Sequence, residues 1–225
     1  MKILVVGSGK LANAIFNAKL VFPNCEVQRW HESLTELSEK TIVIHKGSGR
    51  ELNACLDFCE KTDSVFIELS TGLHTETLNP NFTLIICPNT SILMLKMLHL
   101  FQSYGYHFQH DQITLVESHQ STKTSIPGTA YSIANSLKFP VANITSVRDP
   151  LIQQTRLNIP PEYLNKHAYH KISIQDGMDQ LSIETKVLGH ESYANGVKKI
   201  IDVVLLHPLE KRKYSVIEFI DMNLL

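Results

Sequence analysis

A glycine-rich segment follows directly after the first apolar run of the chain. Residues Lys2–Val6 are typical of a short buried strand, and Gly7-x-Gly9-x-x-Ala12 then opens a helical stretch. In such a turn the first glycine permits a tight bend, and the second lets the backbone approach a pyrophosphate. A small third residue lets the helix pack closely on the sheet, so that its amide groups face the phosphates. The motif predicts dinucleotide binding, and a structural turn without phosphate is the alternative.

The ribose of a dinucleotide is expected to bind an acidic residue about 20 residues beyond the glycine motif. Glu32 stands at this distance from Ala12. Its carboxylate would accept a hydrogen bond from a ribose 2′-hydroxyl and would repel a 2′-phosphate. Arg29 and Lys10 could instead attract a 2′-phosphate. The residues therefore leave NADH and NADPH both open, and they also leave open a solvated surface role for Glu32.

A polar segment between residues 117 and 130 carries the second group of chemically capable side chains. An apolar strand, Gln112–Ser118, delivers His119, and Lys123 follows four residues later. Histidine titrates near neutral pH and can donate a proton, whereas lysine supplies a cation. Exposed amides of Gly128 and Thr129, at the start of a predicted helix, could hold a carboxylate. A polar surface loop is the alternative interpretation of this segment.

The elements that must position these residues change in character along the chain. In the first 90 residues apolar runs alternate with helical patterns, which favours a parallel, doubly wound sheet. Leu52, Cys55, Leu56 and Cys59 would share one face of a helix that Ser48 and Glu51 open with a capping-box pattern. The predicted strands are Lys2–Val6, Glu26–Trp30, Thr41–Ile44, Ser64–Leu69 and Thr83–Cys87.

The second half is typical of an α+β arrangement, with the change of architecture near residue 91. Residues 151–169 contain two adjacent prolines and are predicted as a loop, and Asp176-Gly177 is predicted as the turn of a hairpin. The predicted helices are Ser91–Tyr104, Thr129–Leu137 and Ala194–Leu206, and the predicted strands are Gln112–Ser118, Asn143–Val147, His170–Ile174, Gln180–Val187 and Tyr214–Phe219.

Composition and charge exclude several classes of protein. The chain has 225 residues, 43% of them hydrophobic and 19% charged, which is a globular composition. The formal charge is -1, so nothing indicates a nucleic-acid partner or an anionic membrane. No membrane-spanning run and no signal peptide are recognisable, and the four cysteines are expected to be reduced thiols. We therefore expect a cytoplasmic protein without a metal site, because His99, His107 and His110 have poor ligand spacing.

The polar segment resembles the signature of the dihydrodipicolinate reductase (4-hydroxy-tetrahydrodipicolinate reductase) family, which runs Glu-x-His-His-x-x-Lys-x-Asp-x-Pro-Ser-Gly-Thr-Ala. Here it reads from Glu117 through His119, Lys123 and Pro127-Gly128-Thr129 to Ala130. Four further segments are similar to segments of that family and occur in the same order across nearly the whole chain. They are Leu69-Ser70-Thr71-Gly72, Cys87-Pro88-Asn89-Thr90-Ser91, Val147-Arg148 and Ser192-Tyr193-Ala194-Asn195-Gly196.

The resemblance implies a role for each matched residue. His119 matches the general acid, Lys123 the second proton donor, and Gln120, Gly128 and Thr129 the contacts of the substrate. The stretches implied to contact the cofactor, NADH or NADPH, are Gly7-Ser8-Gly9-Lys10-Leu11-Ala12, Glu32, Leu69-Ser70-Thr71 and Cys87-Pro88-Asn89-Thr90. The implied reaction is the reduction of 4-hydroxy-tetrahydrodipicolinate, a small cyclic dicarboxylate, to tetrahydrodipicolinate in lysine and diaminopimelate biosynthesis.

The resemblance also implies the architecture. The fold class would be α/β, with an N-terminal Rossmann-type parallel-sheet domain and a smaller α+β substrate and oligomerisation domain that has an open mixed sheet. Residues 1–91 and 195–225 would form the dinucleotide-binding domain, and residues 92–194 the substrate domain. Domain closure about two hinges and assembly into a homotetramer are further implications.

Several residues depart from the family pattern. Gln120 replaces the second histidine, Ser125 replaces the aspartate, and the Pro-Ser-Gly-Thr turn is shortened to Pro127-Gly128-Thr129. Gln120 can hydrogen-bond a carboxylate but cannot carry a positive charge, and charge-assisted hydrogen bonds are the stronger kind. A reductase of the same fold acting on another cyclic imine or keto acid, and a non-catalytic dinucleotide-binding sensor, are therefore the alternative functions.

Overall fold

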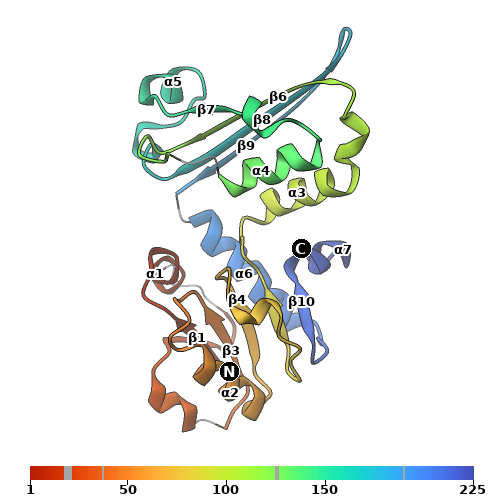
Figure 1. Cartoon of the computed structure of the whole chain (residues 1–225). Coiled ribbons are helices and arrows are strands. Elements are labelled where there is room, and N and C mark those ends of the chain that lie inside the picture. The colour runs from red at the N-terminus through yellow and green to blue at the C-terminus, as the bar shows by residue number, and fades with distance from the viewer. Residues whose placement is uncertain (18–21, 37, 125–126, 190) are drawn as a thin grey trace. The chain divides into compact units, whose positions relative to one another are not determined.

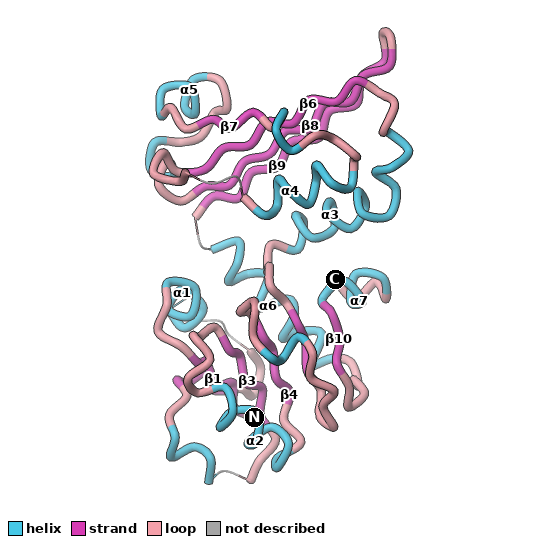
Figure 2. The backbone as a smooth tube through the Cα atoms, in the orientation of Figure 1, coloured by secondary structure: helices cyan, strands magenta, loops and turns pink. Residues whose placement is uncertain are grey.

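The computed structural model describes residues 1–17, 22–36, 38–124, 127–189 and 191–225. Within them the chain forms two compact units, one of Met1–Ile92 with Tyr193–Leu225 and the other of Leu93–Ser192. Figure 1 shows the elements of each unit, and Figure 2 shows which segments are helix and strand. Ser125 lies outside the described residues.

The first unit is built on a six-stranded parallel sheet in the order β10-β5-β4-β3-β1-β2. Strand order reverses at β1, because β2 lies on one side of it and β3 on the other. The predicted parallel sheet is confirmed. The strands are β1 (Lys2–Val6), β2 (Glu26–Arg29), β3 (Thr41–His45), β4 (Val65–Glu68), β5 (Leu84–Ile86) and β10 (Lys213–Ser215).

Both faces of this sheet are buried, as expected for near-continuous apolar strands in a parallel sheet. Leu4, Val43 and Phe66 pack against the apolar face of α2, while their neighbours Ile3 and Ile42 are buried on the opposite face. The helices of the unit are α1 (Lys10–Asn17), α2 (Leu52–Thr62), α6 (Glu191–Leu206) and α7 (Val216–Asp221), with short 3-10 turns η1 (Glu32–Glu36) and η2 (His74–Glu76).

The second unit is built on a four-stranded mixed sheet in the order β7-β6-β8-β9, which confirms the predicted fold class. Figure 2 shows the long hairpin of β8 and β9 that dominates this sheet. Leu115 and Ile172 pack with Ala130 and Ile133 of α4 in its core. The elements are α3 (Ile92–Tyr104), η3 (Gly105–Phe108), β6 (Gln112–His119), α4 (Gly128–Ser136), η4 (Val141–Asn143), β7 (Thr145–Val147), α5 (Pro150–Thr155), η5 (Pro161–Tyr163), β8 (His167–Asp176) and β9 (Asp179–Leu188).

Two sequence interpretations were wrong because local capping decided the structure. Residues 151–169 are not all loop, since Asp149 caps α5 by accepting hydrogen bonds from the amides of Leu151 and Ile152 at 2.7 and 3.2 Å. The predicted strand at 214–219 ends at Ser215. The hydroxyl of Ser215 accepts from the Glu218 amide, and this capping box starts α7.

The predicted capping box at Ser48 was also wrong. Helix α2 begins at Leu52, and its N-cap residue Glu51 makes no side-chain cap. The hydroxyl of Ser48 instead accepts a hydrogen bond from Nε of Arg50 at 3.3 Å.

We expect Gly196→Ala to destabilise the protein although alanine is the better helix former. In α6 a Cβ at residue 196 would lie 1.6 Å from the carbonyl oxygen of Thr90. Helix propensity favours alanine by about 1 kcal/mol. A backbone carbonyl cannot move aside cheaply, so we expect a net loss of about 1 to 3 kcal/mol, the usual range for overpacking.

Urea unfolding at fixed pH would measure this loss. The exposed Lys199→Ala in the same helix is the matched control and is expected to change the unfolding free energy little. An unchanged or raised unfolding free energy in Gly196→Ala would contradict the close approach of α6 to Thr90.

Candidate functional site

The stretches predicted to contact a dinucleotide meet at one edge of the parallel sheet. Gly7 follows β1, Leu69 follows β4 and Cys87 follows β5, and all of these strands run in the same direction. Their carboxyl ends therefore share an edge, which is where open α/β sheets bind ligands. Glu32 starts η1 shortly after β2, which runs parallel to β1, so it also follows the carboxyl end of a strand at this edge.

The glycine turn has the backbone geometry that its sequence predicts. Gly7 has a φ of +107°, and a Cβ there would lie 2.2 Å from the carbonyl oxygen of Lys46. Gly9 has open space instead, since a Cβ would meet nothing within 4 Å. The first glycine is thus required by the fold, and the second leaves room for a ligand.

A hollow of about 230 Å³ lies between this turn and the loop after β3, where the strand order reverses. The start of α1 provides helix amides, and Lys46 and Arg50 provide cations, so the residues suit a diphosphate. The lining residues are Gly7, Ser8, Gly9, Lys46, Gly47, Ser48, Arg50 and Glu51.

A guanidinium, not a carboxylate, ends β2 beside the glycine turn. Arg29 donates to the carbonyl oxygen of Gly7 at 2.9 Å and to Oδ1 of Asn13 at 2.6 Å. Its guanidinium also lies 4.6 Å from the ring centre of Phe16. Glu32 is exposed on η1. The ribose contact of Glu32 stays a prediction, and a cation that would favour a 2′-phosphate lies nearer the turn.

The loop after β5 is held by hydrogen bonds, and its cysteine thiol is unreactive at neutral pH. The Cys87 amide donates to the carbonyl oxygen of Glu68 at 2.8 Å, and the Cys87 thiol donates to the carbonyl oxygen of Asn89 at 3.0 Å. Burial raises the pKa of Cys87 to about 12, so this thiol is not a nucleophile at neutral pH. Cys87 itself would therefore contact a cofactor only through packing and its backbone.

In the second unit His119 ends β6 and pairs with a buried carboxylate. Its Nδ1 lies 2.9 Å from Oε2 of Glu117, whose side chain is fully buried. Arg148 donates to both oxygens of the same carboxylate, from Nη2 at 2.6 Å and from Nη1 at 3.2 Å. With Nδ1–H donating to Glu117, Nε2 of His119 is left as the atom that can exchange a proton with a ligand.

The charge on Glu117 is stabilised by these partners. Burial by itself would raise its pKa, but hydrogen bonds from His119, Arg148 and Ser146 outweigh burial and lower the pKa to about 2. The carboxylate is therefore ionised at any pH at which the protein would work. An ionised Glu117 gives Nδ1–H of His119 an acceptor at 2.9 Å.

Two further histidines adjoin His119 and stay neutral. The ring centre of His170 lies 5.7 Å from that of His119, and burial followed by repulsion from His119 lowers the pKa of His170 to about 4. Burial is also the largest cause of the lowered pKa of His167. Both ring nitrogens of His170 are buried and have no hydrogen-bond partner among the described residues. Of the three, His119 alone contacts a carboxylate within the described parts of the chain.

The loop after β6 carries the remaining predicted residues. The Lys123 amide donates to the carbonyl oxygen of Gln120 at 2.9 Å, and the Lys123 carbonyl oxygen accepts from Nε of Arg148 at 2.8 Å. Arg148 thus holds the backbone of Lys123 and the carboxylate of Glu117 together. Gly128 and Thr129 begin α4 after Pro127, which has no side-chain acceptor to cap the first amides. The structure brings Gln120 and Lys123 to the His119 end of β6, and their contacts with a substrate stay predictions.

Three neighbours of His119 received no role from the sequence. Glu117 could have been found, because residues two apart on a strand share a face. Gln153 could not, since the sequence predicts a loop where α5 forms. Its buried amide donates to the His119 carbonyl oxygen at 2.7 Å and to Ser118 Oγ at 3.0 Å. His170 lies opposite Glu117 only through the antiparallel register of β6 and β8.

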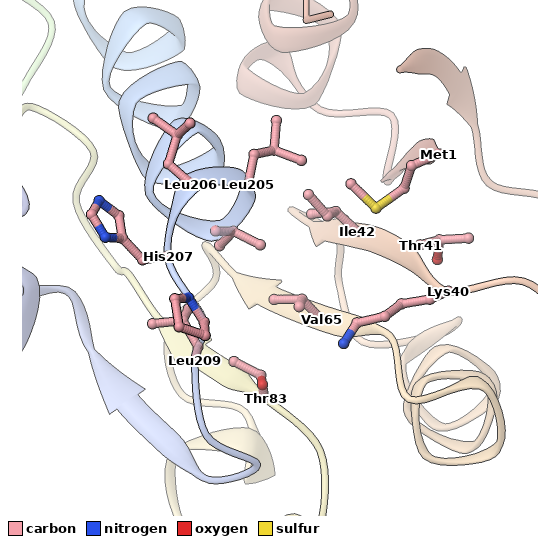
Figure 3. Close-up of a pocket in the computed structure, with 12 residues that line it drawn as sticks. Met1, Lys40, Thr41, Ile42, Val65, Thr83, Leu205, Leu206, His207 and Leu209 are labelled. Carbon is pink, nitrogen blue, oxygen red and sulfur yellow. The ribbon is translucent and has the colours of Figure 1, made fainter. Parts of the chain in front are cut away.

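Other features of the described residues do not compete with this site. A hollow of about 450 Å³ lies at the opposite, amino-terminal edge of the parallel sheet, beside Ile42, Val65 and the end of α6 (Figure 3). None of the predicted site residues lines it. The described parts of the chain contain no group of three metal-ligating side chains, and they contain no helix with the length and apolarity that a bilayer crossing requires.

Comparisons with known proteins agree with the resemblance. No protein-family profile matches the chain. A probable 4-hydroxy-tetrahydrodipicolinate reductase of Oryza sativa subsp. japonica is 26% identical over 69% of this chain, which spans only 50% of that relative. The reductase of Chlamydia trachomatis serovar A is 24% identical, over 94% of this chain and 89% of its own length. Over most of its length the chain is therefore similar to 4-hydroxy-tetrahydrodipicolinate reductases, at low sequence identity.

Solved structures agree in fold. The dipicolinate-bound dihydrodipicolinate reductase from Paenisporosarcina sp. TG-14 superposes with a TM-score of 0.67, covering 98% of this chain and 99% of that chain at 15% identity. A diaminopimelate (DAP) dehydrogenase of C. glutamicum reaches a TM-score of 0.51, over 97% of this chain and 93% of that chain, at 8% identity. The fold of this chain is therefore similar to that of this reductase, at low sequence identity.

We expect Glu117 to make the unfolding free energy of this protein depend on pH. Its pKa is lower in the folded protein than in the unfolded chain, so its stabilising contribution is full above the unfolded value of about 4.5 and is lost as pH falls toward 2. The largest loss from this group is roughly 3 kcal/mol. Glu117→Gln removes the titration, so its unfolding free energy should fall less between pH 6 and pH 3 than that of the unmodified protein.

Urea unfolding at the two pH values measures the difference, with the exposed Glu162→Gln as the matched control. If the unfolding free energy of Glu117→Gln and of the unmodified protein fell equally between pH 6 and pH 3, the contacts of Glu117 would not stabilise its charge.

Proposed function

We propose that this protein is an oxidoreductase that uses NADH or NADPH to reduce 4-hydroxy-tetrahydrodipicolinate to tetrahydrodipicolinate, with loss of the 4-hydroxyl group as water, in lysine and diaminopimelate biosynthesis. The observation that carries the proposal is the His119 site, in which a histidine at a strand end is paired with a buried, ionised glutamate. The reductase names of the relatives and the glycine turn of the first unit support it. A cytoplasmic homotetramer is the assembly we propose.

The first unit would hold the cofactor through its backbone. The turn Gly7–Ala12 and the amides of α1 would contact the diphosphate, with Lys46 and Arg50 as nearby cations. The loops Leu69–Thr71 and Cys87–Thr90 would contact the remainder. When bound, NADH or NADPH supplies the hydride that the reaction requires.

The second unit would supply the proton and bind the dicarboxylate. His119, held by Glu117 at Nδ1, donates a proton from Nε2 to the substrate, and Glu117 stabilises the protonated ring before transfer. Lys123 provides a second cation close to the developing negative charge. The uncapped amides of Gly128 and Thr129 bind a substrate carboxylate, and Gln120 offers a neutral hydrogen bond where the family has a second histidine.

The reaction itself is the direct test. Purified protein should oxidise NADH or NADPH in the presence of freshly formed 4-hydroxy-tetrahydrodipicolinate, followed as the loss of absorbance at about 340 nm, and the two cofactors should be run in parallel. Turnover of a different cyclic imine or keto acid but not of this substrate would move the proposal to another reductase. Cofactor binding without turnover of any substrate would indicate a sensor.

His119→Ala is expected to lower kcat by about 10² to 10⁴, the usual contribution of a general acid. Cofactor affinity should not change, because His119 and the glycine turn belong to different units. His110→Ala, an exposed histidine of the same unit, is the control and should retain full activity. Unchanged kcat in a folded His119→Ala protein would remove the proton-donor role while leaving cofactor binding untouched.

A further inference from the structure

A second histidine–glutamate pair is buried in the first unit, beneath the edge where the cofactor loops meet. His45 is the last residue of β3 and Glu68 the last of β4, and neither side chain has any exposed surface. Nδ1 of His45 lies 2.8 Å from Oε1 and 3.0 Å from Oε2 of Glu68. The proposed chemistry has no use for this pair, and nothing in the sequence motifs singled it out.

The Glu68 carboxylate is connected to the loop that follows β4. Oε1 accepts a hydrogen bond from the Ser70 amide at 2.7 Å, and Oε2 accepts from the Thr75 hydroxyl at 3.3 Å. One buried carboxylate therefore holds both the start of the loop Leu69–Thr71 and the turn η2 that follows this loop. This loop is among those proposed to contact the cofactor.

Two hydrogen bonds, one donated from each loop, join the loop Leu69–Thr71 to the loop after β3. The Ser70 hydroxyl donates to the carbonyl oxygen of Gly47 at 3.0 Å, and Nζ of Lys46 donates to the carbonyl oxygen of Leu69. The carbonyl oxygen of Lys46 in turn lies against Gly7. The His45–Glu68 pair is thus the centre of a network that joins the loops after β1, β3 and β4.

Gly47 shows how closely the histidine ring supports the loop. A Cβ at residue 47 would lie 2.9 Å from Nε2 of His45. That nitrogen is buried and has no hydrogen-bond partner among the described residues. The ring of His45 therefore sits directly under the backbone that lines the 230 Å³ hollow beside Gly7.

Stability alone is a poor explanation for such a pair. Burying two ionisable groups costs more than burying apolar side chains of similar volume, so buried pairs are weak contributors to stability. They are better suited to specifying one arrangement of the backbone. Here the specified backbone is that of Lys46–Ser48 and Leu69–Thr71.

We propose that His45 and Glu68 are positioning residues for the dinucleotide: by fixing the loops after β3 and β4 against the glycine turn, they set the affinity for NADH or NADPH. The pair acts through the loops and does not touch the cofactor. This inference rests on the cofactor binding of the proposed function. It differs from that function in assigning control of cofactor affinity to a buried pair outside every predicted contact stretch.

The single tryptophan of the chain allows cofactor affinity to be measured without turnover. Trp30 directly follows β2 in the same unit, and its emission overlaps the absorption of the reduced nicotinamide, so added NADPH or NADH should quench it. Glu68→Gln keeps the volume but removes the charge and one acceptor. We expect its Kd for the cofactor to rise about tenfold or more, because a hydrogen bond to a buried charged group has been lost.

Glu68→Asp retains the carboxylate and should recover part of the affinity, a rescue that depends on the charge and not on packing. His45→Gln, which keeps a donor near Glu68, should give an intermediate Kd and provides a second route if Glu68→Gln does not fold. Thermal unfolding of each variant, without cofactor, separates stability from affinity.

The other ends of the same two strands provide a matched control. There the Thr41 amide and hydroxyl both donate to Oγ of Ser64, at 2.9 and 3.2 Å, in an equally buried contact. Ser64→Ala should lower thermal stability and leave the cofactor Kd unchanged. If Glu68→Gln and His45→Gln also left Kd unchanged, the positioning role would be wrong. If the unmodified protein itself bound neither cofactor, the proposed function would be at fault instead.

Discussion

The burial of a negative charge at the end of β6 is the constraint on which the candidate catalytic site depends. Glu117 has no exposed surface, and an unpaired carboxylate in that position would be strongly unfavourable. Arg148 and His119 neutralise it from two sides, and each is placed in turn by this requirement. Arg148 also donates a hydrogen bond to the backbone of Lys123. The arginine that neutralises Glu117 therefore also fixes the backbone position of Lys123.

The same arrangement recurs at the edge of the parallel sheet with a different consequence. Glu68, like Glu117, is buried and contacts Nδ1 of a histidine. Glu117 has an arginine partner and leaves His119 partly exposed, with 14% of its side-chain surface accessible, so that histidine can exchange a proton with a ligand. Glu68 has backbone and hydroxyl partners and leaves His45 fully enclosed, so this pair can only hold backbone in place. Accessibility of the histidine therefore separates a chemical role from a positioning role.

Parallel strands explain why motifs far apart in the sequence can act together. Residues 7, 46, 69 and 87 each follow a strand of the same direction, so the sheet delivers all of them to one edge. This consequence was predictable, because the strands could be recognised from their apolar runs. The second unit was predictable in its main strands and in α4, and less so where short helices depend on single caps, as at Asp149 and Ser215.

The sequence by itself determined the class of the fold, the glycine turn and the segment from Glu117 to Thr129, because these depend on local pattern and on resemblance. Only the tertiary structure decided that Arg148 neutralises Glu117, that His170 lies beside His119, and that Glu68 meets His45. Each of these contacts joins residues from different strands or from a strand and a distant loop. Their pairing depends on strand order and register, which alternating polarity does not encode. Burial makes these contacts necessary, because an unpaired polar or charged group inside the fold costs free energy that water would otherwise offset.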